Sequence, residues 1–147
     1  MATKIKNLTF KYGTLLFLLI LMLIFSISNP TFLTLKNLTN VLRQISIVGI
    51  CTVGMTMIIL SGGIDLSVGS TVALTGIVLA KLLVGGMPIF LAVLVTLVIG
   101  TVLGSINALL INHINIPPLI ATLGTISVYR GITYITTGGI AVHGFPD

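Results

Sequence analysis

Long apolar runs alternate with short polar breaks along the chain, and the runs have the length of membrane helices. No charged side chain occurs in residues 12–35, 44–64 or 82–129. A helix needs roughly 20 predominantly apolar residues to cross a bilayer, so these runs have room for several crossings. We therefore predict an all-helical, polytopic integral membrane protein that folds as a helical bundle with about five membrane segments. The segments are expected at residues 12–28, 45–60, 66–83, 88–111 and 119–137.

The first apolar run and the polar stretch after it each allow two interpretations. Residues 12–28 end at Asn29 and Pro30, which stop a helix. We expect a first membrane helix here, and a cleaved signal peptide is the alternative. In residues 29–44, leucine and valine recur at helical spacing among polar residues. This pattern is typical of a short helix on the membrane surface before segment two, although an ordinary loop fits it equally well.

Two later segments repeat small residues every three or four positions. Small side chains at this spacing let two helix backbones approach closely, whereas lipid gives apolar side chains little other reason to associate. We expect these residues at helix–helix contacts. They are Ala73, Gly76 and Ala80 in the third segment, and Gly100, Gly104 and Ala108 in the fourth.

The fifth segment and the orientation of the chain are less strongly determined. Pro117 and Pro118 break the preceding run, and Arg130 lies inside the apolar residues 119–137. A full membrane crossing is our first expectation, and a partial or broken helix that lines a cavity is the second. Lysines precede the first segment, which usually sets the orientation of the others, so the N-terminus is expected in the cytoplasm.

Composition and charge exclude several classes of protein. Of the 147 residues, 56% are hydrophobic and only 6% are charged, which leaves too little polar surface for a water-soluble globule. The net charge is +5, but the cations form no basic face, so nucleic acid is excluded as a partner. One cysteine, Cys51, allows no intramolecular disulfide and no thiolate metal cage, and we expect no metal site. No nucleotide-binding loop occurs, so any ATP chemistry belongs to another subunit. We expect no cofactor and no enzymatic activity in this chain.

The strongest local motif is SGGIDLSVG, residues 61–69, at the junction of the second and third segments. Paired glycines let the backbone turn, and Asp65 or Ser67 can accept hydrogen bonds from the first free amides of the next helix. We predict a structural hinge and helix cap here. An intramembrane carboxylate that binds substrate or senses a partner is the alternative, because Asp costs roughly 2.5 to 3.5 kcal/mol at the bilayer centre. The hinge and cap residues are Gly62, Gly63, Asp65, Ser67 and Gly69.

The order of motifs resembles the permease subunits of ribose, xylose and galactoside-type ATP-binding cassette (ABC) sugar importers. The resemblance rests on NVLRQ at 40–44, GMT at 54–56, SGGIDLSVGS at 61–70, Asn107, PPLIATLGT at 117–125, YRG at 129–131 and TGG at 137–139. It implies a bacterial cytoplasmic (inner) membrane protein of which residues 1–147 are the N-terminal portion of one permease domain. It also implies an ABC ATPase subunit, an extracytoplasmic sugar-binding protein and a second permease copy, identical or not, as partners.

The resemblance further implies transport of a monosaccharide by alternating access, with ATP hydrolysis on the partner subunit. Neutral sugars need hydroxyl and amide partners rather than counter-ions. Candidates for the substrate pathway or for packing are Asn107, Thr122, Thr125 and Arg130. Two other functions stay open. One is an ion-coupled secondary transporter fragment in which Asp65 titrates, and the other is a non-transporting assembly subunit.

Overall fold

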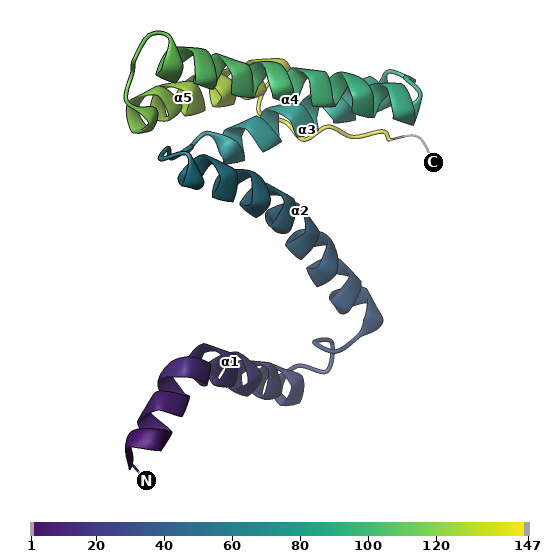
Figure 1. Cartoon of the computed structure of the whole chain (residues 1–147). Helices are drawn as coiled ribbons and strands as arrows, with labels where there is room; N and C mark the ends of the chain where they lie inside the picture. Colours follow the sequence, from purple (N-terminus) through teal and green to yellow (C-terminus); the bar gives the residue numbers. More distant parts are fainter. Residues whose placement is uncertain (1, 146–147) are drawn as a thin grey trace. The chain divides into compact units, whose positions relative to one another are not determined.

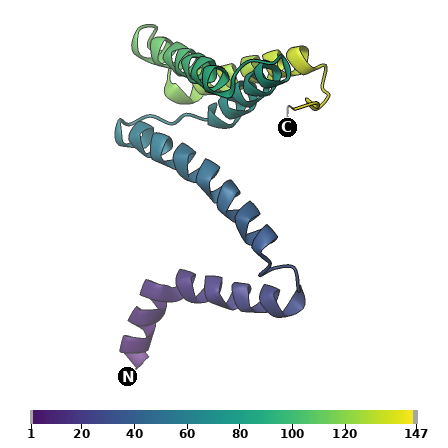
Figure 2. The same cartoon turned by 90° about the vertical axis from the view of Figure 1, so that its right-hand side faces the viewer.

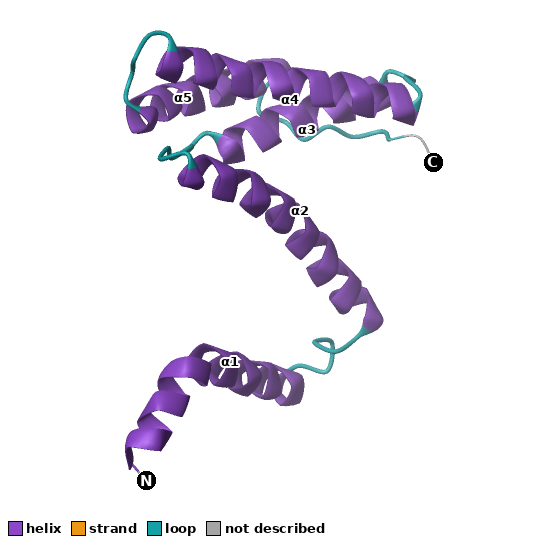
Figure 3. Ribbon diagram, viewed as in Figure 1, coloured by secondary structure: helices purple, strands orange, loops and turns teal. Residues whose placement is uncertain are grey.

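The computed structural model describes the backbone of residues 2–145 and the side chains of residues 12–145, and no strand occurs in this part of the chain (Figures 1 and 3). The prediction of an all-helical protein is therefore confirmed. Contacts between residues divide the chain into two compact units, Met1–Ile50 and Cys51–Asp147. The helices are α1 (Ala2–Ser28), α2 (Leu35–Leu60), α3 (Val68–Val84), α4 (Ile89–Asn112) and α5 (Pro118–Thr137).

Two of the helices, α2 and α4, are long and apolar enough to cross a membrane. The apolar helical segments Tyr12–Ser28 and Val68–Val84 are shorter. Length matters because a helix rises only 1.5 Å per residue, so a short helix reaches both surfaces only of a thin or locally deformed bilayer. Which of the five helices cross the membrane therefore stays a prediction.

In the first unit, the chain breaks between α1 and α2 at Asn29, whose side chain holds a tight turn. Its Oδ1 accepts hydrogen bonds from the backbone amide of Thr31 at 2.9 Å and from the Thr31 hydroxyl at 2.7 Å. Helix α2 then begins at Leu35 and continues without interruption to Leu60. Residues 35–44 are thus helical, as one interpretation expected, but they are the first part of α2 and not a separate helix. No proline or glycine occurs between Leu35 and Ile47, which explains the continuity. The side chains of Lys4, Lys6 and Lys11, on which the expected orientation rests, lie outside the described residues.

In the second unit, α3, α4 and α5 pack against one another (Figure 2). Asn107, near the end of α4, donates a hydrogen bond to Ser67 at the start of α3. At the opposite ends, the Lys81 ammonium in the last turn of α3 donates to the carbonyl of Thr136 near the end of α5. Helices α3 and α5 therefore run in the same direction, and α4 runs against them. The lysine also places a positive charge at the negative end of the α5 dipole.

Leu74, Leu103 and Tyr129 form the small core between these three helices, with Ile99 packed against it. Tyr129 is only 2% exposed, and its hydroxyl donates a hydrogen bond to the backbone carbonyl of Leu103 at 2.8 Å. A buried tyrosine hydroxyl needs such a partner. The ring and this bond together fix α5 against α4.

The small residues expected at helix–helix contacts contribute little to this packing. Ala73, Gly76, Gly104 and Ala108 are exposed, and a Cβ added at Gly76 or Gly104 would meet no atom within 4 Å. Gly100 is different, because its Cβ would lie 3.6 Å from the Thr75 side chain of α3. Ala80 is half-buried. Contacts of the exposed small residues with other segments stay a prediction.

Replacing Tyr129 tests the core. Tyr129→Phe removes one hydrogen bond and is expected to lower the free energy of unfolding by about 0.5 to 1 kcal/mol. Tyr129→Ala also leaves a cavity and is expected to cost on the order of 3 kcal/mol. Tyr134→Phe is the matched control, because Tyr134 is 68% exposed and its substitution should change nothing. Unfolding of the detergent-solubilised chain by sodium dodecyl sulfate, followed by circular dichroism, measures the three values. Equal losses for Tyr129→Phe and Tyr134→Phe would contradict this description of the core.

Candidate functional site

The site begins where α2 ends. The amide of Gly62 donates to the carbonyl of Ile59 at 3.0 Å, and the amide of Gly63 donates to that of Ile58 at 3.0 Å. This pair of bonds is a Schellman motif, which satisfies the last free carbonyls of a helix. Gly62 has a φ of +84°, a left-handed conformation that residues with a Cβ rarely adopt. The glycine pair therefore ends α2 and turns the chain into the link that leads to α3.

Asp65 organises that link. Its Oδ1 accepts hydrogen bonds from the backbone amide of Ser67 at 2.7 Å and from the Ser67 hydroxyl at 2.6 Å. Ser67 is the N-cap residue of α3, but its side chain makes no hydrogen bond to the first amides of that helix. Asp65 thus supports the start of α3 through the N-cap residue, whereas a direct bond from Ser67 to the helix amides is not formed. A role of Gly62, Gly63 and Gly69 as a hinge stays a prediction.

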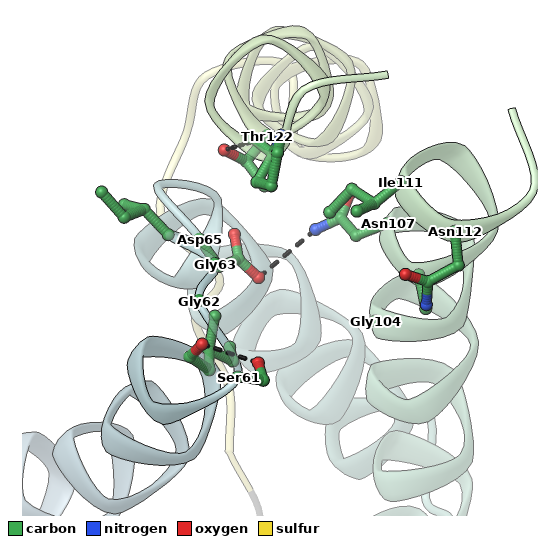
Figure 4. Close-up of a pocket in the computed structure, with 13 residues that line it drawn as sticks. Ser61, Gly62, Gly63, Asp65, Gly104, Asn107, Ile111, Asn112 and Thr122 are labelled. Atoms are coloured by element: carbon green, nitrogen blue, oxygen red, sulfur yellow. Dashed lines mark hydrogen bonds between the residues drawn. The ribbon is translucent and has the colours of Figure 1, made fainter. Parts of the chain in front are cut away.

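Asn107, one of the predicted pathway residues, completes this network from α4. Its Nδ2 donates to Ser67 Oγ at 2.8 Å. It also donates, more weakly, to Asp65 Oδ2 at 3.4 Å (Figure 4). Asp65, Ser67 and Asn107 are here called the Asp65 network. Ser67 is fully buried and Asn107 is 5% exposed. Because polar groups buried in an apolar bundle are costly unless paired, these bonds hold the α2–α3 link against the end of α4.

One atom of the network has no partner. Among the described residues, Asn107 Oδ1 is the buried side-chain oxygen or nitrogen that accepts and donates no hydrogen bond. Leaving a buried acceptor unpaired costs about 1 to 3 kcal/mol. A buried acceptor that lacks a protein partner is typically paired with a ligand or an ordered water.

A cavity of about 360 Å³ adjoins the Asp65 network where α3 and α5 begin and α2 and α4 end (Figure 4). Gly104 and Ala108 line the cavity and leave room on this face of α4 because their side chains are small. The volume is that of a small-molecule site. Its lining consists of Ile58, Ser61, Gly62, Gly63, Ile64, Asp65, Gly104, Asn107, Ala108, Ile111, Asn112, Pro118 and Thr122.

The other predicted pathway residues lie in different surroundings. Thr122 is fully buried and lines the cavity. Thr125 is also buried, one turn along α5, but it does not line the cavity and its hydroxyl donates to the carbonyl of Thr122 at 3.2 Å. Arg130 is exposed, and it makes no hydrogen bond or ion pair within the part of the chain that the structure describes. The structure therefore brings Asn107 and Thr122 together at one site and leaves Thr125 and Arg130 outside it.

Sequence reasoning missed the pairing of Asp65 with Asn107 and the contribution of Asn112. The pairing joins residues that are far apart in the chain, and no local pattern identifies such partners. Helical periodicity could have identified Asn112, because it lies one turn after Ala108 and two turns after Gly104 on the same face of α4.

Comparisons with known proteins agree on one class. Residues 37–144 match the family model described as "branched-chain amino acid transport system / permease component". The ribose import permease protein of Haemophilus influenzae is 46% identical over 131 residues, and that of Bacillus subtilis is 47% identical over 134 residues. The D-allose transport system permease protein of Escherichia coli is 42% identical over 137 residues. No solved structure gives a significant match.

These alignments cover most of this chain and less than half of each relative. They include 88% of the chain and 41% of the H. influenzae protein, 91% and 42% for the B. subtilis protein, and 92% and 42% for the E. coli protein. The chain thus spans well under half the length of the curated relatives it matches. Activities that need a whole permease are therefore inferred for this chain and are not transferred from the relatives.

Gly62 tests the end of α2. Gly62→Ala forces a Cβ into the left-handed region and is expected to lower the free energy of unfolding by about 1 to 2 kcal/mol. Gly76→Ala is the matched control in the middle of α3. Nothing lies within 4 Å of its added Cβ, so a gain of up to about 1 kcal/mol is expected from helix propensity. Unfolding in mixed micelles compares the two variants, and a loss for Gly76→Ala equal to that for Gly62→Ala would contradict the interpretation.

Asp65 tests the network. Asp65→Asn keeps an oxygen at the Oδ1 position and is expected to leave membrane assembly nearly unchanged. Asp65→Leu removes the acceptor for the buried Ser67 amide and hydroxyl, so a loss of about 1 to 3 kcal/mol is expected. Assembly is measured as the fraction of membrane-inserted chain that is monodisperse after extraction into mild detergent. Normal assembly of Asp65→Leu would refute the supporting role of this carboxylate.

Proposed function

The chain belongs to the family described as branched-chain amino acid transport system / permease component, and we propose that it forms part of the permease subunit of an ATP-driven, binding-protein-dependent monosaccharide importer. The observation that carries this proposal is the identity of 42–47% to relatives named for ribose and D-allose, over about nine-tenths of the chain. The family description names amino acids, but the more similar individual proteins are named for sugars. We therefore favour a sugar as the solute.

The proposed assembly contains an ABC ATPase subunit, an extracytoplasmic sugar-binding protein and a second permease copy, in a bacterial inner membrane. The binding protein delivers the sugar to the outer opening, and ATP-driven movement of the permease opens the path to the cytoplasm. The permease makes and breaks no covalent bond, so ATP hydrolysis belongs to the partner. The near absence of charge in the bundle supports a neutral solute, because an ionic one would require fixed counter-charges.

In the proposed membrane arrangement the N-terminus is cytoplasmic and each of the five helices crosses once. The polar first part of α2, residues 35–44, then lies at the membrane surface. This topology puts the ends of α2 and α4 and the starts of α3 and α5 on the cytoplasmic side. The cavity beside the Asp65 network would consequently open toward the cytoplasm.

Residues of the pathway divide into two groups under this proposal. Asn107 and Thr122 contact the solute at the cavity, whereas Thr125 and Arg130 act through packing or at other surfaces. Gly62 and Gly63 provide the hinge that lets the α2–α3 link change its angle during transport. The exposed small residues of α3, Ala73 and Gly76, contact further helices of the assembled permease.

Uptake of radiolabelled D-ribose and D-allose into membrane vesicles tests the function. The vesicles contain the chain together with an ABC ATPase subunit and a sugar-binding protein from the same organism. We expect uptake that requires both ATP and the binding protein, with no effect of collapsing the proton gradient while ATP is held constant. Vesicles that lack only this chain are the control.

Two results would overturn the proposal. Loss of uptake on collapse of the proton gradient would favour an ion-coupled carrier with Asp65 as the coupling group, because this partly buried carboxylate lines the cavity. Absence of any solute uptake, in vesicles where the assembled complex is present, would favour a non-transporting assembly subunit.

A further inference from the structure

The hydrogen bonds of the Asp65 network have only one possible direction. A carboxylate accepts but does not donate, so the Ser67 hydroxyl gives its single proton to Asp65 Oδ1 at 2.6 Å. The Ser67 oxygen is then left as an acceptor, and the group 2.8 Å away on Asn107 must be the donating Nδ2. Exchanging the nitrogen and oxygen of this amide would put Oδ1 against the lone pairs of Ser67 and near Asp65 Oδ2. The chemistry of the neighbours therefore assigns the amide orientation.

This direction leaves Asn107 Oδ1 as an unused acceptor. Asn107 is 5% exposed, and its Oδ1 has no partner among the described residues. The same side chain lines the cavity of about 360 Å³ (Figure 4). Oδ1 itself is covered by neighbouring atoms, so a donor in the cavity reaches it only when the side chains around it move.

The hydroxyl groups of two lining residues have already given their protons to backbone carbonyls. Ser61 gives its proton to the carbonyl of Ile58 at 2.7 Å, and Thr122 gives its proton to that of Pro118 at 2.8 Å. Asp65 Oδ2 receives only the 3.4 Å contact from Asn107. Asn112, which is exposed, is the lining side chain that can still donate. The polar side chains of the lining are therefore mostly acceptors, which suits a ligand with hydroxyl protons.

We propose that this cavity is a solute subsite that recognises hydroxyl groups as hydrogen-bond donors, with Asn107 Oδ1 as the main acceptor and Asp65 Oδ2 as the second. The identity of the solute as a monosaccharide rests on the proposed function. The volume is large for a single water, which occupies about 30 Å³ in the liquid, and is in the range of small-molecule sites.

A hydroxyl fits this cavity better than a metal ion does. The lining holds one carboxylate, and its Oδ1 is already engaged by both Ser67 donors. No group of three or more His, Cys, Asp or Glu occurs among the described residues. Hard cations take six or more oxygen ligands, usually with several carboxylates. A neutral polyol needs only the two acceptors that the Asp65 network leaves available.

Deoxyfluoro sugars test the proposal without altering the protein. Fluorine replaces a hydroxyl at similar size but carries no proton, so it cannot donate to Asn107. The full chain in lipid nanodiscs is titrated calorimetrically with D-ribose, D-allose and their deoxyfluoro and deoxy derivatives. We expect saturable binding of at least one parent sugar at millimolar concentration. At one ring position, the fluoro and the deoxy derivative should both bind about tenfold or more weakly, because a site that pairs with a hydroxyl rejects an analogue lacking it.

Two variants locate the effect. Asn107→Leu is expected to reduce binding of the parent sugar about tenfold or more and to abolish the difference between the parent and its fluoro derivative. Ser105→Leu is the matched control, because Ser105 lies two residues away on the exposed side of α4, outside the lining. It should bind like the unaltered chain. Circular dichroism and gel filtration check that both variants fold. If Asn107→Leu does not fold, the sugar series on the unaltered chain still tests the proposal.

Several outcomes would overturn the subsite. They are absence of saturable sugar binding, equal affinity for parent and fluoro sugars at every position, unchanged binding by a folded Asn107→Leu, and binding of Na⁺ or K⁺ without sugar. Vesicle uptake separates this inference from the proposed function. If ATP-dependent uptake is found together with any of these outcomes, only the subsite is refuted. If hydroxyl-dependent binding is found without uptake, only the proposed function is refuted.

Discussion

Pairing of polar groups inside an apolar bundle is the constraint on which this structure depends. Lipid and apolar side chains offer no hydrogen bonds, so each buried donor or acceptor must find a partner within the protein. The Asp65 network meets this requirement by joining the α2–α3 link to α4, and in doing so it fixes where α3 begins. Because Asp65 accepts and Ser67 passes on its only proton, the network also decides which atom of Asn107 remains unused.

The same constraint explains the other polar contacts of the second unit. Threonine hydroxyls along α3, α4 and α5 return their protons to carbonyls one turn earlier, as Thr75, Thr96 and Thr133 do. Tyr129 donates to α4, and Lys81 donates to the end of α5. Satisfied groups of this kind hold helices together and have no proton left to donate to a ligand. Against that background, one unsatisfied atom beside a cavity is the informative feature.

The sequence was sufficient to predict what local chemistry decides. The breaks at Pro30 and at Gly62–Gly63 lie where α1 and α2 end, whereas α2 begins at Leu35 and not at residue 45. Asp65 was expected to cap α3, and it supports the start of that helix through Ser67. The sequence was not sufficient to predict the contacts that depend on tertiary packing. The small residues of α3 and α4 suggested helix contacts, but most face away from the core or line the cavity, because Leu74, Leu103 and Tyr129 provide the contact. The approach of Asn107 to Asp65 follows from the antiparallel packing of α4, which periodicity alone does not specify.

The carbonyl of the Asn107 side chain provides the most direct test of the central claim, which is that a ligand completes the Asp65 network at Oδ1. The chain is labelled with ¹³C-asparagine in lipid nanodiscs, and the side-chain carbonyl signal of residue 107 is assigned by its absence from a spectrum of Asn107→Leu. The account predicts that D-ribose or D-allose shifts this signal saturably in the direction of a stronger hydrogen bond, while the signals of exposed asparagines stay in place. A signal that does not move at concentrations where sugar binds to the chain would contradict the account.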